Sequence, residues 1–245
     1  MDDEELRICL VTPVWNDTSR LRDFGARLAR ALADAALPIR WVIADDGSGS
    51  GECEQLATLR ETFAAIYPQV ELHLADAHRG KGAVVREAWA LHPDDDFLAF
   101  IDADGSASPE DLFHLINTAV KDDTSVLGVR KRTATTEVVE SLYRGLVHRM
   151  FLLAVHLILG LRAEDPQCGL KVLKGADYRA IESQLLEIGL AFDSELLAAL
   201  HHNGARWTEL PISWIEKDGG KVHPLRDGWG MLATLLRVRK RLRAA

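Results

Sequence analysis

Residues 97–106 read Phe-Leu-Ala-Phe-Ile-Asp-Ala-Asp-Gly-Ser, an apolar run that ends in two carboxylates one residue apart. A short run of consecutive apolar residues is typical of a buried strand. Open α/β folds bind ligands at the carboxyl ends of their strands, so we expect Asp102 and Asp104 at the binding edge of a sheet. Carboxylate oxygens are preferred ligands of hard divalent cations. The pair therefore predicts a site for a divalent cation that carries a diphosphate.

Strands and helices alternate around this stretch. Apolar strand patterns occur at 8–14, 41–44, 70–74 and 97–101, and helical patterns occur at 19–37, 52–67 and 81–91. A β-α-β-α order predicts the α/β class with a doubly wound, mostly parallel sheet flanked by helices. Parallel strands end at the same edge of the sheet, so we expect the loops after these four strands to converge there.

The loops at this edge carry polar side chains and glycines. They are residues 12–17 (TPVWND), 45–48 (DDGS), 79–82 (RGKG) and 102–105 (DADG). Asp17, Asp45 and Asp46 can accept hydrogen bonds from a base or ribose, and Lys81 can pair with phosphate. Neither a Gly-x-Gly-x-x-Gly fingerprint nor a complete P-loop is present, which argues against a dehydrogenase or a kinase. Together the loops predict a nucleotide-diphosphate site.

Composition limits the remaining classes. The 245 residues, 47% of them hydrophobic, fit one large domain, and the net charge of −8 argues against nucleic-acid binding. Three widely spaced cysteines suggest free thiols in a reducing compartment. The acidic start lacks the pattern of a secretory signal, and no apolar run approaches the roughly 20 residues of a membrane span. We therefore expect a cytoplasmic protein, in contact with a membrane only at its inner surface.

The second half of the chain is richer in helical patterns. Residues 141–161 read as a long helix that is amphipathic at first and almost wholly apolar afterwards. Either packing on the sheet or lying on a membrane or partner explains this pattern. Helices near 175–187 and 193–203 and a strand-like segment at 207–214 follow. A last helix, 229–242, is basic towards its end, which suits a solvated face or contact with a membrane or phosphate.

Five segments in order resemble family 2 glycosyltransferases of the GT-A fold. They are RGKGAVVR at 79–86, DADG at 102–105, DPQCGLK at 165–171, FDSELL at 192–197, and WIE at 214–216 with GGK at 219–221. The chain is most similar to dolichyl- and polyprenyl-phosphate glucosyltransferases, and also to polyprenyl-phosphate mannosyltransferases. The resemblance implies a single domain, 1–245. Its nucleotide-sugar-binding half is about 6–128, and its acceptor-binding half with amphipathic helices is about 129–245.

The resemblance also implies roles for residues. For the nucleotide sugar these are Thr12, Pro13, Trp15, Asp17, Asp45, Asp46, Lys81, Asp102 and Ala103. Asp102 and Asp104 would bind Mg²⁺ or Mn²⁺, which stabilises the departing nucleoside diphosphate and gives Asp104 a catalytic part. For the acceptor, the implied residues are Arg130, Arg144, Gln167, Lys171 and Lys221.

The need for a general base depends on the acceptor. A phosphate monoester is already anionic and can attack the anomeric carbon unaided. A sugar hydroxyl would lose a proton, with Asp165 and Asp193 as the candidate bases. Both carboxylates also have structural interpretations: Asp165 as a brace for the loop before Gly169, and Asp193 as the N-cap of a helix over 194–201. We assign no role to His148.

The leading hypothesis is an inverting, metal-dependent transfer of a hexose to a polyprenyl phosphate. UDP-glucose is the preferred donor and GDP-mannose the second choice. A soluble transferase for a small-molecule or natural-product acceptor is the alternative, and a non-catalytic nucleotide-sugar-binding module is a further one, which the presence of both Asp102 and Asp104 disfavours. The chain departs from the family pattern in its first loop, with Trp15-Asn16-Asp17 for Tyr-Asn-Glu, and it has Leu170 where an aromatic is usual. It lacks the Gln-x-x-Arg-Trp signature, so a single transfer is expected.

Overall fold

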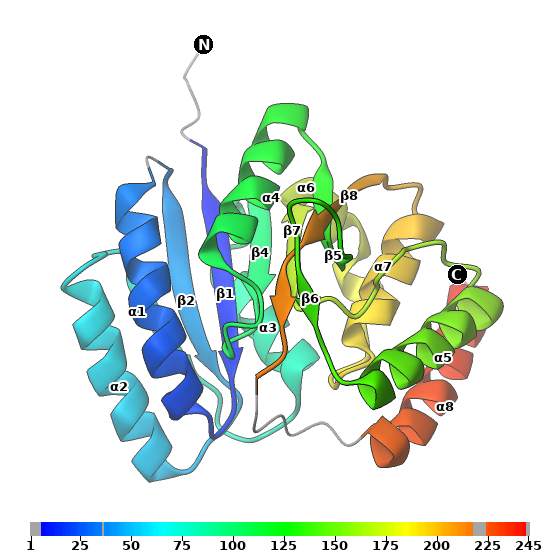
Figure 1. The fold of residues 1–245 in the computed structure, drawn as a ribbon, viewed down its shortest axis with the longest axis horizontal. Helices are drawn as coiled ribbons and strands as arrows, with labels where there is room; N and C mark the ends of the chain where they lie inside the picture. The colour runs from blue at the N-terminus through cyan, green and yellow to red at the C-terminus, as the bar shows by residue number, and fades with distance from the viewer. Residues whose placement is uncertain (1–5, 36, 218–223, 244–245) are drawn as a thin grey trace.

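The protein is built on one central sheet with helices on both faces (Figure 1). A computed structural model describes residues 6–35, 37–217 and 224–243, without the side chains of Leu142, Arg144 and residues 224–229. The sheet has seven strands in the order β3-β2-β1-β4-β7-β5-β8. Their bounds are β1 Ile8–Val14, β2 Ile39–Asp45, β3 Val70–Leu74, β4 Phe97–Ile101, β5 Ser125–Arg130, β7 Leu170–Lys174 and β8 Trp207–Ile212. Two short strands, β6 (Val138–Val139) and β9 (Trp214–Ile215), pair separately.

The sheet is mostly parallel, which confirms the predicted fold class. β3, β2, β1 and β4 run in parallel, and β8 is parallel to β5. β7 alone among these seven is antiparallel to its neighbours, β4 and β5. Because β7 lies between β4 and β5, strands from both expected halves of the chain belong to one sheet.

Each face of the sheet is covered by helices, so its central strands are buried on both sides. α1 (Thr18–Asp34), α2 (Ser50–Ala64) and α4 (Pro109–Asp122) contribute to the core on one face. α3 (Lys81–Ala90), α6 (Gly175–Ile181) and α7 (Phe192–His202) contribute to the core on the other. Every residue of β4 is buried, as its uninterrupted apolar run predicts. Asp102 therefore follows directly after a strand that is packed on both faces.

α5 (Leu142–Leu159) and α8 (Pro224–Leu242) pack together at the end of the molecule opposite α1 and α2 (Figure 1). Among the described helices, none combines the length and the hydropathy needed to cross a membrane. The expected helix over 175–187 is shorter: α6 ends at Ile181, and a 3-10 turn, Glu182–Gln184, follows. The backbone N–H groups of the next loop, at 186 and 187, donate to the Glu195 carboxylate, which holds the chain out of the helix.

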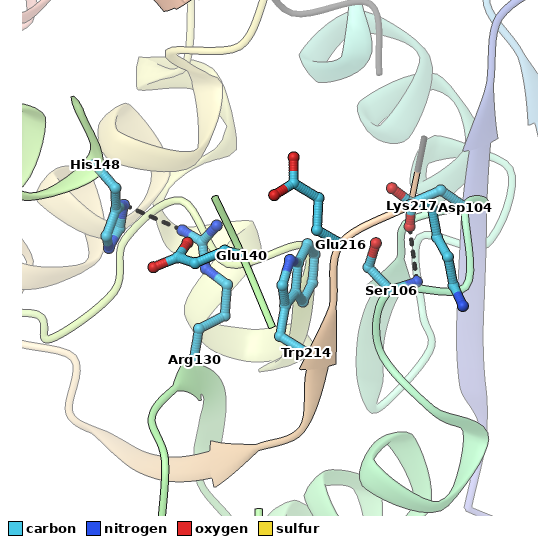
Figure 2. A pocket seen from close by; sticks show the side chains of 8 residues that line it. All are labelled: Asp104, Ser106, Arg130, Glu140, His148, Trp214, Glu216 and Lys217. Carbon is cyan, nitrogen blue, oxygen red and sulfur yellow. Dashed lines mark hydrogen bonds between the residues drawn. The ribbon is translucent and has the colours of Figure 1, made fainter. Parts of the chain in front are cut away.

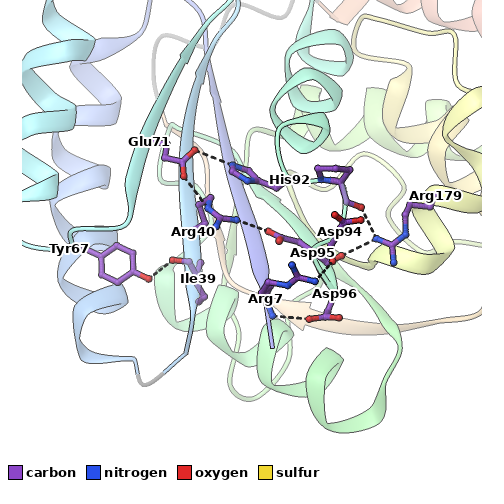
Figure 3. A network of polar contacts seen from close by, with 11 residues as sticks. Arg7, Ile39, Arg40, Tyr67, Glu71, His92, Asp94, Asp95, Asp96 and Arg179 are labelled. Atoms are coloured by element: carbon purple, nitrogen blue, oxygen red, sulfur yellow. Dashed lines mark hydrogen bonds and ion pairs between the residues drawn. The ribbon is translucent and has the colours of Figure 1, made fainter. Parts of the chain in front are cut away.

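Ion pairs fasten the amino edge of the sheet (Figure 3). Arg40 pairs with Glu71 at 3.0 Å and with Asp95 at 3.2 Å, and His92 lies 3.0 Å from Glu71. The backbone N–H of Arg7 donates to Asp96 at 2.8 Å. These contacts connect residues at the amino ends of β1, β2, β3 and β4, so this end of the sheet has a structural role.

The three cysteines are free thiols, as predicted. Cys9 and Cys168 are buried and Cys53 is half-buried. Burial raises the pKa of Cys168 to about 12, so this thiol stays protonated and unreactive.

Candidate active site

The loops at the carboxyl edge of the sheet converge, as the sequence predicts. The first loop joins the second where the backbone N–H of Asn16 donates to Ser48 Oγ at 2.7 Å. The second joins the third where Asp46 accepts two backbone hydrogen bonds of 2.8 Å from residues 79 and 80. The third joins the fourth through Lys81 Nζ, 2.9 Å from Asp102 Oδ1. The four loops thus form one connected site.

The carboxylates of Asp45 and Asp46 accept hydrogen bonds that hold the second and third loops in place. Asp45 has no exposed surface and accepts hydrogen bonds from the backbone N–H and the hydroxyl of Ser48. Asp46 is also buried, and His78 Nδ1 lies 2.8 Å from its Oδ2. Gly47 has a φ of +66°, and a Cβ there would lie 2.2 Å from the backbone of the loop at 77–78. The structure therefore places both carboxylates under the predicted nucleotide loop and gives them protein partners.

The residues expected from the first loop differ in their access to a ligand. Thr12 is buried and accepts a 2.9 Å hydrogen bond from Trp41 Nε1, and Pro13 is half-buried. Trp15 is 36% exposed and stacks on His78 with ring centroids 4.0 Å apart. Trp15 is therefore the exposed aromatic side chain of this loop.

Arg20 is a member of the site that we did not predict. Its Nε lies 2.9 Å from Asp17 Oδ1 and 2.7 Å from Oδ2, and its Nη1 lies 3.5 Å from Asp104 Oδ2. The hydrogen bonds to Asp17 raise the pKa of Arg20. The spacing of the two residues, three apart at a helix start, is the signal that sequence reasoning could have used. Arg20 connects the first loop to the predicted metal ligand.

Asp102 and Asp104 are held in place but remain partly accessible, with side chains 33% and 22% exposed. Asp104 Oδ1 accepts a 2.9 Å hydrogen bond from the backbone N–H of Ser106. A Cβ at Gly169 would lie 2.0 Å from Asp102 Oδ2, so only glycine leaves room for that carboxylate. Ala103, between them, is buried.

The donor set fits a divalent cation that is shared with a substrate. In the described part of the chain, no three His, Cys, Asp or Glu side chains come together as a metal site. Mg²⁺ is commonly held by one or two carboxylates together with phosphate oxygens and water. Asp102 and Asp104 would supply the carboxylate ligands. The oxygens of a diphosphate would supply ligands that do not come from the protein.

Two lysines, one fully buried and one partly buried, lie next to Asp193. Lys171 is fully buried, with its Nζ 2.7 Å from Asp193 Oδ1 and 2.7 Å from the carbonyl oxygen of Cys168. Lys81 Nζ lies 3.4 Å from Asp193 Oδ2. Burial alone would lower the pKa of Lys81, but Asp102 and Asp193 outweigh it and hold that pKa above its usual value. The ammonium group of Lys81 is therefore charged.

These contacts correct two expectations. Lys171 has no surface from which to contact an acceptor phosphate, because the carboxylate of Asp193 and a carbonyl oxygen enclose its ammonium group. Asp193 does not cap a helix over 194–201, because α7 begins at Phe192 and its N-cap residue is Ala191. Asp193 is buried, and each of its carboxylate oxygens faces a lysine ammonium group.

Arg130 is fixed against Asp165. Its Nε lies 2.7 Å from Asp165 Oδ2 and its Nη2 2.8 Å from Oδ1, a bidentate pair. The guanidinium lies 5.2 Å from the centre of the Trp214 ring, and Nη2 is 3.2 Å from His148 Nδ1. Within the described residues, Arg130 Nη1 has no hydrogen-bond or ion-pair partner. One edge of the guanidinium is thus available to a ligand.

The titratable partners of Arg130 are shifted in pKa. Burial alone would raise the pKa of Asp165, but the hydrogen bonds and charge of Arg130 outweigh it and hold that pKa below its usual range. Asp165 is therefore a poor general base and acts as the brace for Arg130. Burial, reinforced by the charge of Arg130, lowers the pKa of His148, so its imidazole is neutral near pH 7.

One cavity joins the predicted metal ligand to this arginine (Figure 2). Its volume is about 110 Å³. The lining side chains are Asp104, Ser106, Arg130, Glu140, His148, Trp214, Glu216 and Lys217. Figure 2 shows Arg130 and His148 on one side, Asp104 and Ser106 on the other, and Trp214 between them. A group bound at Arg130 would thus share a cavity with a metal at Asp104.

Of the other expected acceptor residues, Gln167 and Lys171 are described by the structure and are not part of this lining. Gln167 Nε2 donates to Ser194 Oγ at 2.9 Å, so it connects two segments of the protein. The side chain of Arg144 and the whole of Lys221 lie outside the described residues. His148, to which we assigned no role, lines the cavity, and its position four residues after Arg144 in the polar stripe of the helix was the available signal.

Comparisons with known proteins agree with this geometry. Residues 9–162 match the family model described as glycosyl transferase family 2. A dolichyl-phosphate beta-glucosyltransferase from Saccharomyces cerevisiae is 30% identical, over 97% of this chain and 75% of the relative. An undecaprenyl-phosphate mannosyltransferase from Micrococcus luteus is 26% identical, over 88% of this chain and 86% of the relative.

Solved structures share the fold. The structure of glucosyl-3-phosphoglycerate synthase from Mycobacterium tuberculosis, in complex with Mn²⁺, uridine diphosphate and glucosyl-3-phosphoglycerate, matches with a TM-score of 0.65 at 14% identity. The match covers 97% of this chain and 80% of that one. With the family match over more than half of its length, this chain belongs to glycosyltransferase family 2 and has the GT-A fold.

Proposed function

We propose that the protein transfers a hexose, glucose from UDP-glucose, to a polyprenyl phosphate with inversion at the anomeric carbon. The observation that carries this proposal is the single cavity that contains both Asp104 and Arg130. It supplies a place for a metal-bound diphosphate and, beside it, a guanidinium for an anionic acceptor. In a transfer from a nucleotide sugar to a phosphate, the leaving diphosphate and the attacking phosphate are the two groups that carry negative charge.

The donor side suits a nucleoside diphosphate. The stacked Trp15 offers an aromatic face for a base, and Asp102 and Asp104 offer carboxylates for Mg²⁺ or Mn²⁺. The metal, when bound, would neutralise charge that develops on the departing diphosphate. The structural neighbour from M. tuberculosis, whose fold is the same, was solved with Mn²⁺ and uridine diphosphate. The relative from S. cerevisiae at 30% identity is named as a glucosyltransferase, which favours glucose as the transferred sugar.

The acceptor side suits a phosphate monoester. Arginine binds phosphate through paired N–H groups, and Asp165 orients Arg130 while no group in the described part of the chain forms a hydrogen bond or ion pair with Nη1. The relatives from S. cerevisiae and M. luteus are named for dolichyl phosphate and undecaprenyl phosphate. Both names describe a long-chain polyprenyl phosphate, which would bring this protein to a membrane surface.

The chemistry then requires no strong base. An oxygen of the acceptor phosphate forms the new bond to the anomeric carbon as the bond to the nucleoside diphosphate breaks. The attacking oxygen is already anionic near neutral pH, so no proton has to be removed. This agrees with the engagement of Asp165 and Asp193 in ion pairs. Arg130 would orient the attacking phosphate, which is the larger part of the protein's contribution on this side.

The deciding experiment is transfer of labelled sugar from UDP-glucose or GDP-mannose, with Mn²⁺, in the presence and absence of undecaprenyl phosphate in detergent. We expect organic-extractable label from UDP-glucose, lost in Asp104→Ala. A water-soluble labelled product formed with small phosphorylated or hydroxylated acceptors, and no lipid product, would replace this proposal with the soluble-acceptor alternative. Lipid product formed equally well by Asp104→Ala would contradict the metal-dependent site.

A further inference from the structure

One face of α5 carries a row of exposed apolar side chains, the α5 stripe. Its members are Tyr143, Leu146, Met150, Leu153 and Leu157, which are 49–71% exposed. They recur every three or four residues, so they lie along one side of the helix. Large apolar side chains collected on one exposed face usually mark an interaction site.

The opposite face of α5 already packs against the protein. Val155 is fully buried, and Phe151, Ala154 and Ile158 pack against the core beneath it. The stripe is therefore the second apolar face of a helix whose first face is covered. The fold does not need this second face to form its core.

Basic residues gather next to the stripe. α5 contains no Asp or Glu, although the chain as a whole carries a net charge of −8. α8 packs against α5, and in the part of the chain that the structure describes its Arg239, Lys240 and the adjoining Arg243 have no ion-pair partner. Arg241, by contrast, pairs with Glu187. The unpaired cations are thus concentrated at one end of this helix pair.

A second cavity lies at this end, between α5, α7 and α8. Its volume is about 390 Å³, and its lining combines apolar side chains with four basic ones. The apolar part comes from residues 157–160, and the basic part is His201, His202, Arg239 and Arg243. An apolar wall beside unpaired guanidinium groups matches an amphiphile with an anionic head.

We infer that the α5 stripe and the basic end of α8 bind the surface of an anionic lipid bilayer. The stripe lies at the boundary of headgroups and acyl chains, and Arg239 and Arg243 hold lipid phosphate at the second cavity. This inference rests on the proposed function in one respect. α5 also carries His148 of the acceptor cavity, roughly 14 Å along the helix from Leu157. A bilayer on the stripe would bring a lipid phosphate within reach of Arg130.

Flotation of the full chain with vesicles tests the surface without any polyprenyl phosphate. The vesicles contain phosphatidylcholine alone or with added phosphatidylglycerol. We expect binding that is stronger with phosphatidylglycerol, and a decrease of about tenfold or more for Leu157→Asp. Leu91→Asp is the matched control, because Leu91 is 52% exposed at the end of α3. The double variant Arg239→Gln/Arg243→Gln should lose the preference for phosphatidylglycerol, roughly tenfold.

Three results would overturn the inference. They are no binding of the wild type to either vesicle, equal losses in Leu157→Asp and Leu91→Asp, or a dimer in light scattering that Leu157→Asp dissociates while vesicles are not bound. Circular dichroism and UDP binding confirm that each variant is folded. Transfer to a short-chain, water-soluble prenyl phosphate should survive Leu157→Asp. Vesicle binding without transfer to any prenyl phosphate would reject the proposed function and leave the bilayer surface standing.

Discussion

The donor side and the acceptor side of the site both hold carboxylates against cations, but the donor side adds a pair whose cation is fully buried, Lys171 with Asp193. On the donor side, Asp102 and Asp193 are tied to Lys81 and to the fully buried Lys171. On the acceptor side, Asp165 holds Arg130 at the cavity wall, beside a helix with an exposed apolar face. The donor side is thus fixed by the core before a substrate arrives. On the acceptor side, Asp165 and His148 contact the Nε and Nη2 atoms of Arg130. In the described part of the chain, Nη1 has no such contact.

The largest effect should come from the core beneath the donor side. Lys171→Met leaves Asp193 with only the more distant Lys81, and breaking a buried pair destabilises a protein by about 3 to 5 kcal/mol. Urea unfolding measures the loss. Lys131→Met is the control, since Lys131 forms a 2.9 Å pair with Glu164 that is about half exposed on both sides, and solvent screens such a pair so that its loss costs far less. Equal losses would show that the donor side is not anchored by its buried pair.

The next effect concerns the position of Asp102. Gly169→Ala places a Cβ 2.0 Å from Asp102 Oδ2, and the partly exposed carboxylate must move. We expect transfer to fall by about a hundredfold, because small displacements at a reacting centre cost that much, while the melting temperature changes little. Gly189→Ala is the matched control, because nothing lies within 4 Å of a Cβ there. A large loss of stability with unchanged transfer would contradict this account.

The same contrast explains what the sequence could and could not predict. The position of Asp102 and Asp104 after the end of a buried strand was predictable, because a short unbroken apolar run between turn residues is typical of a strand covered on both faces. The reversed direction of β7 was not, because the pattern Leu-Lys-Val-Leu-Lys does not indicate in which direction a strand runs. Lys171 appeared in a recognisable motif, but its burial depends on Asp193, 22 residues further on. The burial of Asp45 and Asp46 likewise depends on hydrogen-bond partners in loops, which the sequence pattern does not identify.

The sequence predicted which residue types lie at the acceptor side. It did not predict which residues they contact. Arg130 was expected to meet a phosphate, and the structure adds that Asp165 orients it. His148 lines the cavity only because α5 starts at Leu142 and turns that face inward. Helical periodicity gives the two faces of such a helix. It does not say which neighbour each face will meet.

A third prediction separates acceptor from donor binding. Arg130→Lys keeps a positive charge but loses the bidentate geometry with Asp165 and the planar face over Trp214. We expect the KM for the lipid phosphate to rise roughly tenfold, the cost of one charged hydrogen bond, with the KM for UDP-glucose unchanged. Arg132→Lys, an exposed arginine two residues away, should alter neither constant. A rise confined to the donor KM would place Arg130 on the donor side.

The smallest effect is the pH dependence that His148 adds to stability. Burial and the charge of Arg130 lower the pKa of His148 in the folded protein, whereas in the unfolded chain it titrates near the usual value of about 6.5. As the pH falls through that value, the unfolded chain takes up the proton first, so the folded state loses stability. His148→Gln should therefore lose less stability than the wild type between neutral and mildly acidic pH. Urea unfolding at both pH values measures the difference. Identical losses would show that Arg130 does not keep His148 neutral. His148 would then be a second cation beside Arg130, and the acceptor phosphate would meet two positive charges instead of one.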